Sequence, residues 1–310
     1  MKDFENLKDF DKTEFQAVAI PALKSGFFDK TSWAYDVLYE YATETDDEDE
    51  EDEEDEDYDP EVDYDDVMEA LEVLLQEMGA KQAPPEVTRF LDFVYALAVE
   101  NEDEGRINDW GSIYYTGQIG TQDFKKAAEL YLIADRLGNA NATCNLGYIY
   151  YYGRTGEVDY EKAYLYFSKS AMRDKCENSL YKIGDMYRNG YFVAKDEKAA
   201  FEIYMNAYRS YRQEKEKSPY DYDWAVEADV NFRLGDCKMN GIGTEKDLME
   251  ALMYLQCAER GFVERVKRGD YFLRKMLRST IEKQAQIREE LSKELPDMDW
   301  AKDVAGYDTL

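Results

Sequence analysis

The feature that most constrains the fold of this chain is a nine-residue pattern that occurs four times. Each copy has glycine at its third and ninth positions, and the copies read DWGSIYYTG, NLGYIYYYG, KIGDMYRNG and RLGDCKMNG. Their first glycines are Gly111, Gly147, Gly184 and Gly235. Successive first glycines are 36, 37 and 51 residues apart. A period of this size predicts stacked units of supersecondary structure that each contact their neighbours, rather than one globular core.

Each unit is predicted to contain two helices. Apolar residues at helical spacing, such as Ala142, Leu146 and Ile149, indicate a first helix, called helix A. Helix A is expected near residues 107–116, 143–152, 180–189 and 229–240. It should end at the second glycine of the pattern, because glycine adopts the left-handed conformation of a helix C-terminus without a Cβ penalty. These second glycines are Gly117, Gly153, Gly190 and Gly241.

The second helix of each unit, helix B, is expected to begin at an aspartate that caps its free N–H groups. These aspartates are Asp123, Asp159, Asp196 and Asp247, and small residues follow them at Ala127, Ala163, Ala199 and Ala251. The first glycine of the pattern lies inside helix A, where glycine is less favourable than alanine by about 1 kcal/mol. A close crossing of the two helices, with the small residue facing the glycine, is the predicted reason for its recurrence.

The glycine and aspartate patterns together resemble the Sel1-like repeats, a solenoid-forming family related to the tetratricopeptide repeats. The matching lines are L-G-x-x-Y-x-x-G on helix A and D-x-x-K-A-x-x-x-[YF] on helix B. The fullest match is Leu146, Gly147, Tyr150, Gly153, Asp159, Lys162, Ala163 and Phe167. Trp110 and Lys238 depart from the pattern. The resemblance covers about residues 90–262 and implies an all-α, right-handed α-solenoid of antiparallel helix pairs.

The remainder of the chain is predicted to flank or interrupt this array. The predicted division is an N-terminal helical segment at 1–43, an acidic disordered loop at 44–66, a degenerate repeat or N-terminal cap at 67–105, four repeats at 106–262, and a C-terminal helical cap and tail at 263–310. The long interval between Gly184 and Gly235, the last two first glycines of the pattern, indicates an insertion near residues 210–226. Its charged and turn-forming residues, RQEKEKSPYDYD, predict a loop between repeats.

Charge sets the predicted class of partner. The chain has 38 Lys and Arg against 69 Asp and Glu, a formal net charge of −31. This charge argues against nucleic acid and anionic membranes as partners and favours a basic protein. Twelve consecutive carboxylates occupy residues 46–57. Such a run is interpreted either as a solubilising insertion or as a segment that attracts a basic partner. It has no central glycine, which argues against an EF-hand calcium loop.

The residue types present exclude several kinds of chemistry. The chain has no histidine, so it has no Ser-His or Cys-His nucleophile pair. Its four cysteines form no C-x-x-C pair, which predicts reduced thiols and no metal site. We therefore expect no catalytic residues, no cofactor and no metal. No apolar stretch is long enough to span a membrane, no secretory signal is recognised at residues 1–25, and a cytoplasmic location is expected.

Tyrosine gives the candidate binding surface. Several tyrosines lie on the first two A helices, and a helix of 3.6 residues per turn cannot turn all of them inward. They are interpreted either as a partner-binding patch or as packing between repeats. The predicted binding residues, all on A helices, are Tyr115, Tyr148, Tyr151, Tyr152, Asp185 and Arg188. Asp185 and Asp236 are expected to be solvated surface carboxylates, and Met249 and Met253 are expected in the core.

Two functional hypotheses follow from the solenoid and its charge. The first is a non-enzymatic scaffold or adaptor that holds a polypeptide on the A-helix face. The alternative is an immunity or inhibitor protein that neutralises a basic toxin, for example a nuclease, through electrostatically steered binding. Sel1-like proteins occur in both roles, so the resemblance leaves both open. A third hypothesis, an enzyme, is disfavoured by the absence of histidine and of any recognised catalytic motif.

Overall fold

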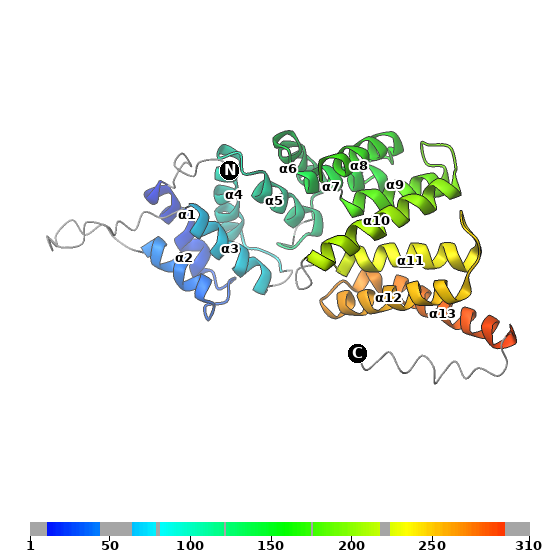
Figure 1. The fold of residues 1–310 in the computed structure, drawn as a ribbon. Helices are drawn as coiled ribbons and strands as arrows, with labels where there is room; N and C mark the ends of the chain where they lie inside the picture. The colour runs from blue at the N-terminus through cyan, green and yellow to red at the C-terminus, as the bar shows by residue number, and fades with distance from the viewer. Residues whose placement is uncertain are drawn as a thin grey trace. The chain divides into compact units, whose positions relative to one another are not determined.

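The computed structural model describes residues 11–43, 64–78, 81–120, 122–174, 176–217 and 224–294. Every regular element in this part of the chain is a helix (Figure 1). The chain divides into two compact units, unit 1 at residues 1–157 and unit 2 at residues 158–310. The predicted all-α solenoid of helix pairs is confirmed, and the right-handed sense of its superhelix stays a prediction.

Unit 1 contains α1 to α7, and most of its helix pairs are neighbours in sequence. The bounds are Lys12–Lys24 for α1, Trp33–Thr43 for α2, Tyr64–Met78 for α3, Pro85–Glu100 for α4, Glu104–Thr116 for α5, Phe124–Leu137 for α6 and Ala140–Tyr151 for α7. Helices α5 and α6 form a helix pair, and α1 also packs on α4. The predicted N-terminal helical segment therefore comprises two helices that join the core of unit 1.

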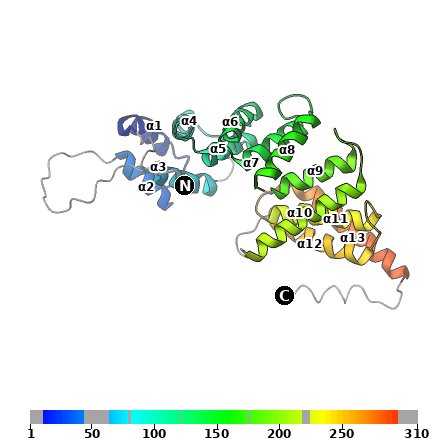
Figure 2. The same cartoon turned by 45° about the horizontal axis from the view of Figure 1, so that its top comes forward.

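Unit 2 continues the alternation of A and B helices. The bounds are Tyr160–Asp174 for α8, Glu177–Asn189 for α9, Glu197–Lys217 for α10, Trp224–Asn240 for α11, Leu248–Lys267 for α12, Tyr271–Leu273 for the short 3-10 helix η2, and Arg274–Glu294 for α13. Figure 2 shows α9, α10 and α11 side by side, and their contact is filled by Tyr181, Tyr204 and Leu234. Helix α13 closes the unit by packing Ile287 and Leu291 against α12.

The local signals that were predicted to begin and end the helices are confirmed. All four second glycines have a left-handed backbone, with φ of 73° at Gly117, 60° at Gly153, 73° at Gly190 and 67° at Gly241. All four aspartates accept a hydrogen bond from a backbone N–H in the first turn of helix B. The donors are Lys126 to Asp123, Lys162 to Asp159, Ala199 to Asp196 and Glu250 to Asp247.

In three repeats the first glycine lies at a close crossing, and the nearest side chain is a large one rather than the predicted alanine. A Cβ on Gly111 would stand 2.6 Å from the ring of Tyr131, and one on Gly184 would stand 2.5 Å from the ring of Tyr204. At Gly235 the corresponding neighbour is Leu255, at 2.7 Å. Each neighbour lies eight residues after the capping aspartate. The glycine therefore makes room for a large side chain of helix B. At Gly235 the carbonyl oxygen of the predicted Ala251 also lies near, at 3.3 Å, and the predicted pair of Gly147 and Ala163 stays a prediction.

Three further predictions are corrected by the structure. The insertion near 210–226 is helical through Lys217, because it extends α10, while residues 218–223 lie outside the described residues. Ala199 is only half-buried, and the fully buried small residue of that repeat is Ala200. Met249 and Met253 are exposed on α12, whereas they were expected in the core.

The acidic segment falls largely outside the part of the chain that the structure describes. Residues 44–63 are not described, and the predicted loop at 44–66 is too long at its C-terminal end, because α3 begins at Tyr64. Asp65 and Asp66 belong to that helix, where Asp65 pairs with Arg106 and Asp66 accepts a hydrogen bond from Tyr41. The predicted tail at 295–310 also lies outside the described residues.

Candidate interaction surface

Four of the predicted binding residues form one group in unit 1. This tyrosine cluster consists of Tyr115 near the end of α5 and Tyr148, Tyr151 and Tyr152 at the end of α7. The rings of Tyr148 and Tyr152 stack with centroids 6.1 Å apart, and Tyr151 meets Tyr152 edge-on at 5.0 Å. Tyr152 remains 46% exposed, while the other three are half-buried. Packing among the rings accounts for part of the tyrosine excess, and a binding role for the exposed faces stays a prediction.

A cation that was not predicted from the sequence joins the tyrosine cluster. The guanidinium carbon of Arg154 lies 5.3 Å from the ring centroid of Tyr152 and 6.0 Å from that of Tyr115. It also lies 5.1 Å from the ring of Phe124. The left-handed Gly153 turns the chain so that the Arg154 N–H donates to the carbonyl of Ile149 at 2.9 Å. In the sequence, Arg154 comes directly after Gly153, the second glycine of the pattern. That position is the signal that could have identified Arg154 as part of the surface.

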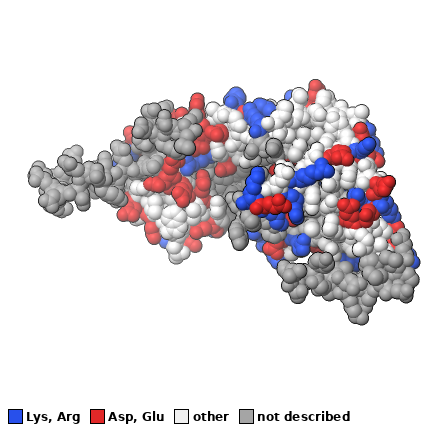
Figure 3. All heavy atoms as spheres, in the orientation of Figure 1, with Lys and Arg blue, Asp and Glu red and all other residues white. Residues whose placement is uncertain are grey.

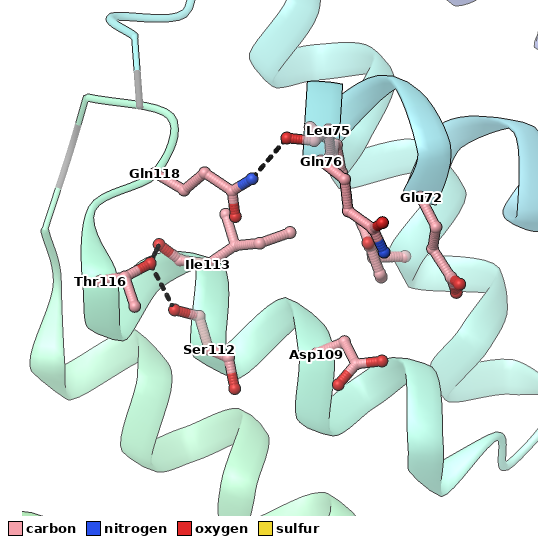
Figure 4. Close-up of a pocket in the computed structure, with 9 residues that line it drawn as sticks. Glu72, Leu75, Gln76, Asp109, Ser112, Ile113, Thr116 and Gln118 are labelled. Carbon is pink, nitrogen blue, oxygen red and sulfur yellow. Dashed lines mark hydrogen bonds between the residues drawn. The ribbon is translucent and has the colours of Figure 1, made fainter. Parts of the chain in front are cut away.

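Unit 1 also has an acidic hollow between α3 and α5 (Figure 4). Its lining residues are Glu72, Leu75, Gln76, Tyr95, Asp109, Ser112, Ile113, Thr116 and Gln118, and its volume is about 220 Å³. Gln118 braces the two sides by donating from its side chain to the carbonyl of Leu75 at 2.6 Å. The backbone adds a second brace, because the Lys81 N–H donates to the carbonyl of Gln118 at 2.9 Å.

The carboxylates of the hollow are poorly compensated. Glu72 lies 3.5 Å from Nε of Arg106, whose guanidinium also pairs with Asp65 and Asp103. Asp109 makes no ion pair within the described residues and accepts a hydrogen bond from Asn108 at 3.1 Å. Loss of solvent around the two carboxyl groups raises the pKa of Glu72 and of Asp109, despite the nearby Arg106. Within the part of the chain that the structure describes, Asp109 has no ion-pair partner and Glu72 shares Arg106 with two other carboxylates.

In unit 2 the equivalent face is filled by internal ion pairs. Asp185 on α9 accepts two hydrogen bonds from Arg233 on α11, each 2.7 Å long, and a third from the hydroxyl of Tyr204 at 2.8 Å. The side chains of Asp185 and Arg233 are only 15% and 12% exposed. Burial alone would raise the pKa of Asp185, but Arg233, with smaller contributions from Lys182 and Tyr204, holds that pKa below its ordinary value of 3.8.

A second set of ion pairs involves Asp236 on α11. Its carboxylate pairs with Arg188 of α9 and with Lys283 of α13. Burial alone would raise the pKa of Asp236, and these two cations outweigh burial and lower it below 3.8. The expectation that Asp185 and Asp236 are solvated surface carboxylates is therefore wrong. Asp185 and Arg188, predicted as binding residues, are both engaged in pairs that join neighbouring helices of unit 2.

The charge distribution differs between the two units on the face that Figure 3 shows. Acidic side chains gather over the helices of unit 1, and side chains of both signs are interspersed over unit 2. The structure thus brings together the four predicted tyrosines and places Asp185 and Arg188 in the ion pairs of unit 2. Within unit 1, the residues that sequence reasoning missed are Arg154 and the two carboxylates of the hollow.

Few groups among the described residues suggest a metal-binding or catalytic role. No cluster of three or more acidic or cysteine side chains in that part of the chain has an arrangement suited to a metal ion. The four cysteines are free thiols, and burial raises the pKa of Cys237 to about 12. Across the described helices, none is both long enough and apolar enough to cross a membrane.

Comparison with known families agrees with this geometry. The model of the Sel1 repeat matches residues 107–139, 140–175, 178–208 and 228–260. The chain carries four Sel1 repeats. Each match covers one helix pair, namely α5 with α6, α7 with α8, α9 with α10 and α11 with α12, and the last two matches end inside α10 and α12. Sel1 repeats indicate a scaffold for protein–protein interaction. Among proteins of curated function, none matches the chain.

Two solved structures are similar to this Sel1-repeat chain at low identity. One is a Sel1 repeat protein from Oxalobacter formigenes, with 21% identity and a TM-score of 0.48, over 63% of this chain and 68% of that one. The other is c5321, a protective antigen of uropathogenic Escherichia coli with an SLR fold. It has 19% identity and a TM-score of 0.42, over 75% of this chain and 60% of its own.

Proposed function

We propose that this protein is a non-enzymatic scaffold whose A-helix face in unit 1 binds a basic polypeptide partner. The observation that carries the proposal is the tyrosine cluster with Arg154. Partly exposed tyrosines that already pack on one another are held in place, so a partner gains contact area with little loss of side-chain entropy. A cation over their rings adds a donor that can reach the backbone carbonyls of a bound peptide.

The acidity of unit 1 supports a basic partner over a neutral one. Long-range attraction between an acidic surface and a basic ligand raises the association rate, and it weakens as salt screens the charges. The same acidity suits the second candidate, an inhibitor of one basic toxin. The two candidates differ in breadth, because a scaffold accepts many peptides that share a short motif, whereas a dedicated inhibitor requires one folded target.

The proposal predicts that the tyrosine cluster governs peptide binding. A random peptide library displayed on phage, selected against the immobilised full-length protein, should yield basic peptides that bind in solution. Tyr152→Ser should weaken them by about tenfold or more, the size typical of an aromatic interface anchor. Titration calorimetry at low and physiological salt measures the loss.

The matched control is Leu165→Ser on α8, because Leu165 is a comparably exposed apolar side chain on a B helix, 56% exposed against 46% for Tyr152. It should leave peptide affinity unchanged. If Tyr152→Ser and Tyr148→Ser both leave affinity unchanged while Leu165→Ser lowers it, the partner lies on the B helices and the proposed surface is wrong.

A further inference from the structure

The acidic hollow of unit 1 lacks the internal cations that its counterpart in unit 2 has. Two residues before the first glycine, the third and fourth repeats carry Lys182 and Arg233. Both cations contact the carboxylate of Asp185, with Arg233 forming the bidentate pair and Lys182 standing 3.6 Å away. The same position of the first repeat carries Asp109. A carboxylate therefore stands where the later repeats supply positive charge.

The described residues around the hollow supply little positive charge. The guanidinium of Arg106 lies beside the hollow and is shared among Glu72, Asp65 and Asp103. Its side chain is fixed by these pairs and by the ring of Tyr64, which lies 5.0 Å from the guanidinium carbon. Asp109 has no ion pair in the described part of the chain. Loss of solvent raises the pKa of Glu72 and of Asp109, and the nearby Arg106 does not offset this effect.

The hydroxyl of Tyr95, which faces the hollow, suits the same ligand chemistry. Tyr95 lines the hollow, is 2% exposed, and is fixed by stacking on Trp110 with ring centroids 4.3 Å apart. Its hydroxyl makes no hydrogen bond within the described residues, and the carboxylates of Glu72 and Asp109 both act on its pKa. A tyrosine hydroxyl oxygen can accept a hydrogen bond from a cationic N–H group. An ammonium or guanidinium group held by the two carboxylates would lie near this hydroxyl and could donate to it.

The apolar walls of the hollow suit the methylene stem of a lysine or arginine side chain. Leu75 of α3 and Ile113 of α5 provide apolar surface, and Figure 4 shows the carboxylate of Glu72 and that of Asp109 projecting from opposite helices. Lysine and arginine bury their methylene stems on apolar surface while their charged ends stay with polar partners. The hollow provides both the apolar surface for the stem and the carboxylates for the charged end.

We propose that the hollow between α3 and α5 is a receptor site for one lysine or arginine side chain of the bound polypeptide, held by Glu72 and Asp109. The inference rests on the proposed function and deepens it, because it assigns a recognition residue to the partner. The partner's cation completes between α3 and α5 the kind of pair that Arg233 and Asp185 make between α11 and α9.

The test uses short peptides as probes on the full chain. Acetyl-Ala-Lys-Ala-amide and its arginine analogue are titrated into the labelled protein and followed by amide NMR. Both should shift the signals of Ser112, Ile113 and Gln118 with millimolar affinity that weakens as salt rises. The norleucine analogue has the same stem without the charge and should leave these signals in place. Magnesium chloride at matched ionic strength reports on counter-ion effects alone.

The decisive comparison is between two pairs of substitutions with the same change in net charge. Glu72→Gln with Asp109→Asn should abolish the shifts, while Glu104→Gln with Glu129→Gln, at exposed positions of α5 and α6, should preserve them. Neutralising the hollow should also leave the thermal transition unchanged or raise it, because it removes uncompensated charge. We therefore expect the Glu72→Gln, Asp109→Asn variant to fold.

Three results overturn the inference: no shift at the hollow, equal shifts with the norleucine peptide or with magnesium, or full shifts in the Glu72→Gln, Asp109→Asn variant. None of these bears on the phage-selected peptides, whose dependence on Tyr152 tests the proposed function separately. Conversely, the signals at the hollow could shift while binding of the selected peptides does not depend on Tyr152. That result would retain the basic-side-chain site and reject the tyrosine surface.

Discussion

Arg233→Met is expected to destabilise unit 2 by about 3–5 kcal/mol, the effect of removing one partner from a buried ion pair. The substitution leaves the carboxylate of Asp185, 15% exposed, with only Lys182 at 3.6 Å and the hydroxyl of Tyr204. It also removes a donor to Asp229 at 3.2 Å. Hydrogen exchange of α9 and α11 measures the loss, because it reports on unit 2 separately from unit 1.

A double replacement tests whether the loss comes from the orphaned charge. Arg233→Met with Asp185→Leu removes both charges and should recover most of the stability, since a buried pair replaced by apolar groups is often close to neutral. Lys293→Met, which breaks an exposed pair with Glu289 on α13, should have no measurable effect. If Arg233→Met alone changes exchange no more than Lys293→Met does, the pair contributes nothing to unit 2.

The same ion pairs predict an acid limit for unit 2. The pKa values of Asp185 and Asp236 in the folded protein lie below 3.8, so the unfolded chain binds their protons more tightly than the folded chain does. Their contribution to stability is therefore complete above that value and is lost as the pH falls through the lowered folded pKa values. Asp185→Leu with Arg233→Met should make unit 2 less sensitive to acid below pH 3.8.

Sequence predicted best those features that are decided within a few residues. The capping aspartates and the left-handed glycines are confirmed because their chemistry is local: a carboxylate accepts from an N–H two or three residues ahead, and a glycine relieves a clash with its own backbone. The same logic located the four A helices, although each begins a few residues before its predicted start.

Features that depend on distant partners were predicted poorly. Asp185 and Arg233 are 48 residues apart in sequence. Their pairing follows from how α9 and α11 pack, so the charge pattern of the sequence does not predict it. The insertion near 210–226 was expected to be a loop from its composition, but RQEKEK is also a good helix-forming sequence and lengthens α10. Arg154 joins the tyrosine cluster only because Gly153 turns the chain back over α7.

Gly184→Leu is expected to have the second large effect on stability. A Cβ at Gly184 would stand 2.5 Å from Cε1 of Tyr204, a fully buried ring whose hydroxyl is fixed by Asp185. Overpacking of this kind costs about 1–3 kcal/mol and more when backbone must move. Even Gly184→Ala should destabilise unit 2, because the clash of its methyl outweighs the gain of about 1 kcal/mol in helix propensity. Chemical unfolding of the variants measures both effects.

Gly105→Ala on α5 is the matched control for this argument. There a Cβ would meet only Oδ1 of Asp103, at an ordinary contact distance of 3.5 Å. Helix propensity then acts without a clash, so the substitution should be neutral or stabilising by up to about 1 kcal/mol. Tyr204→Ala should make Gly184→Ala less destabilising, because it removes the ring that the new methyl would otherwise meet at 2.5 Å. If Gly184→Ala stabilises the protein as Gly105→Ala does, the close crossing is not the reason that glycine recurs in helix A.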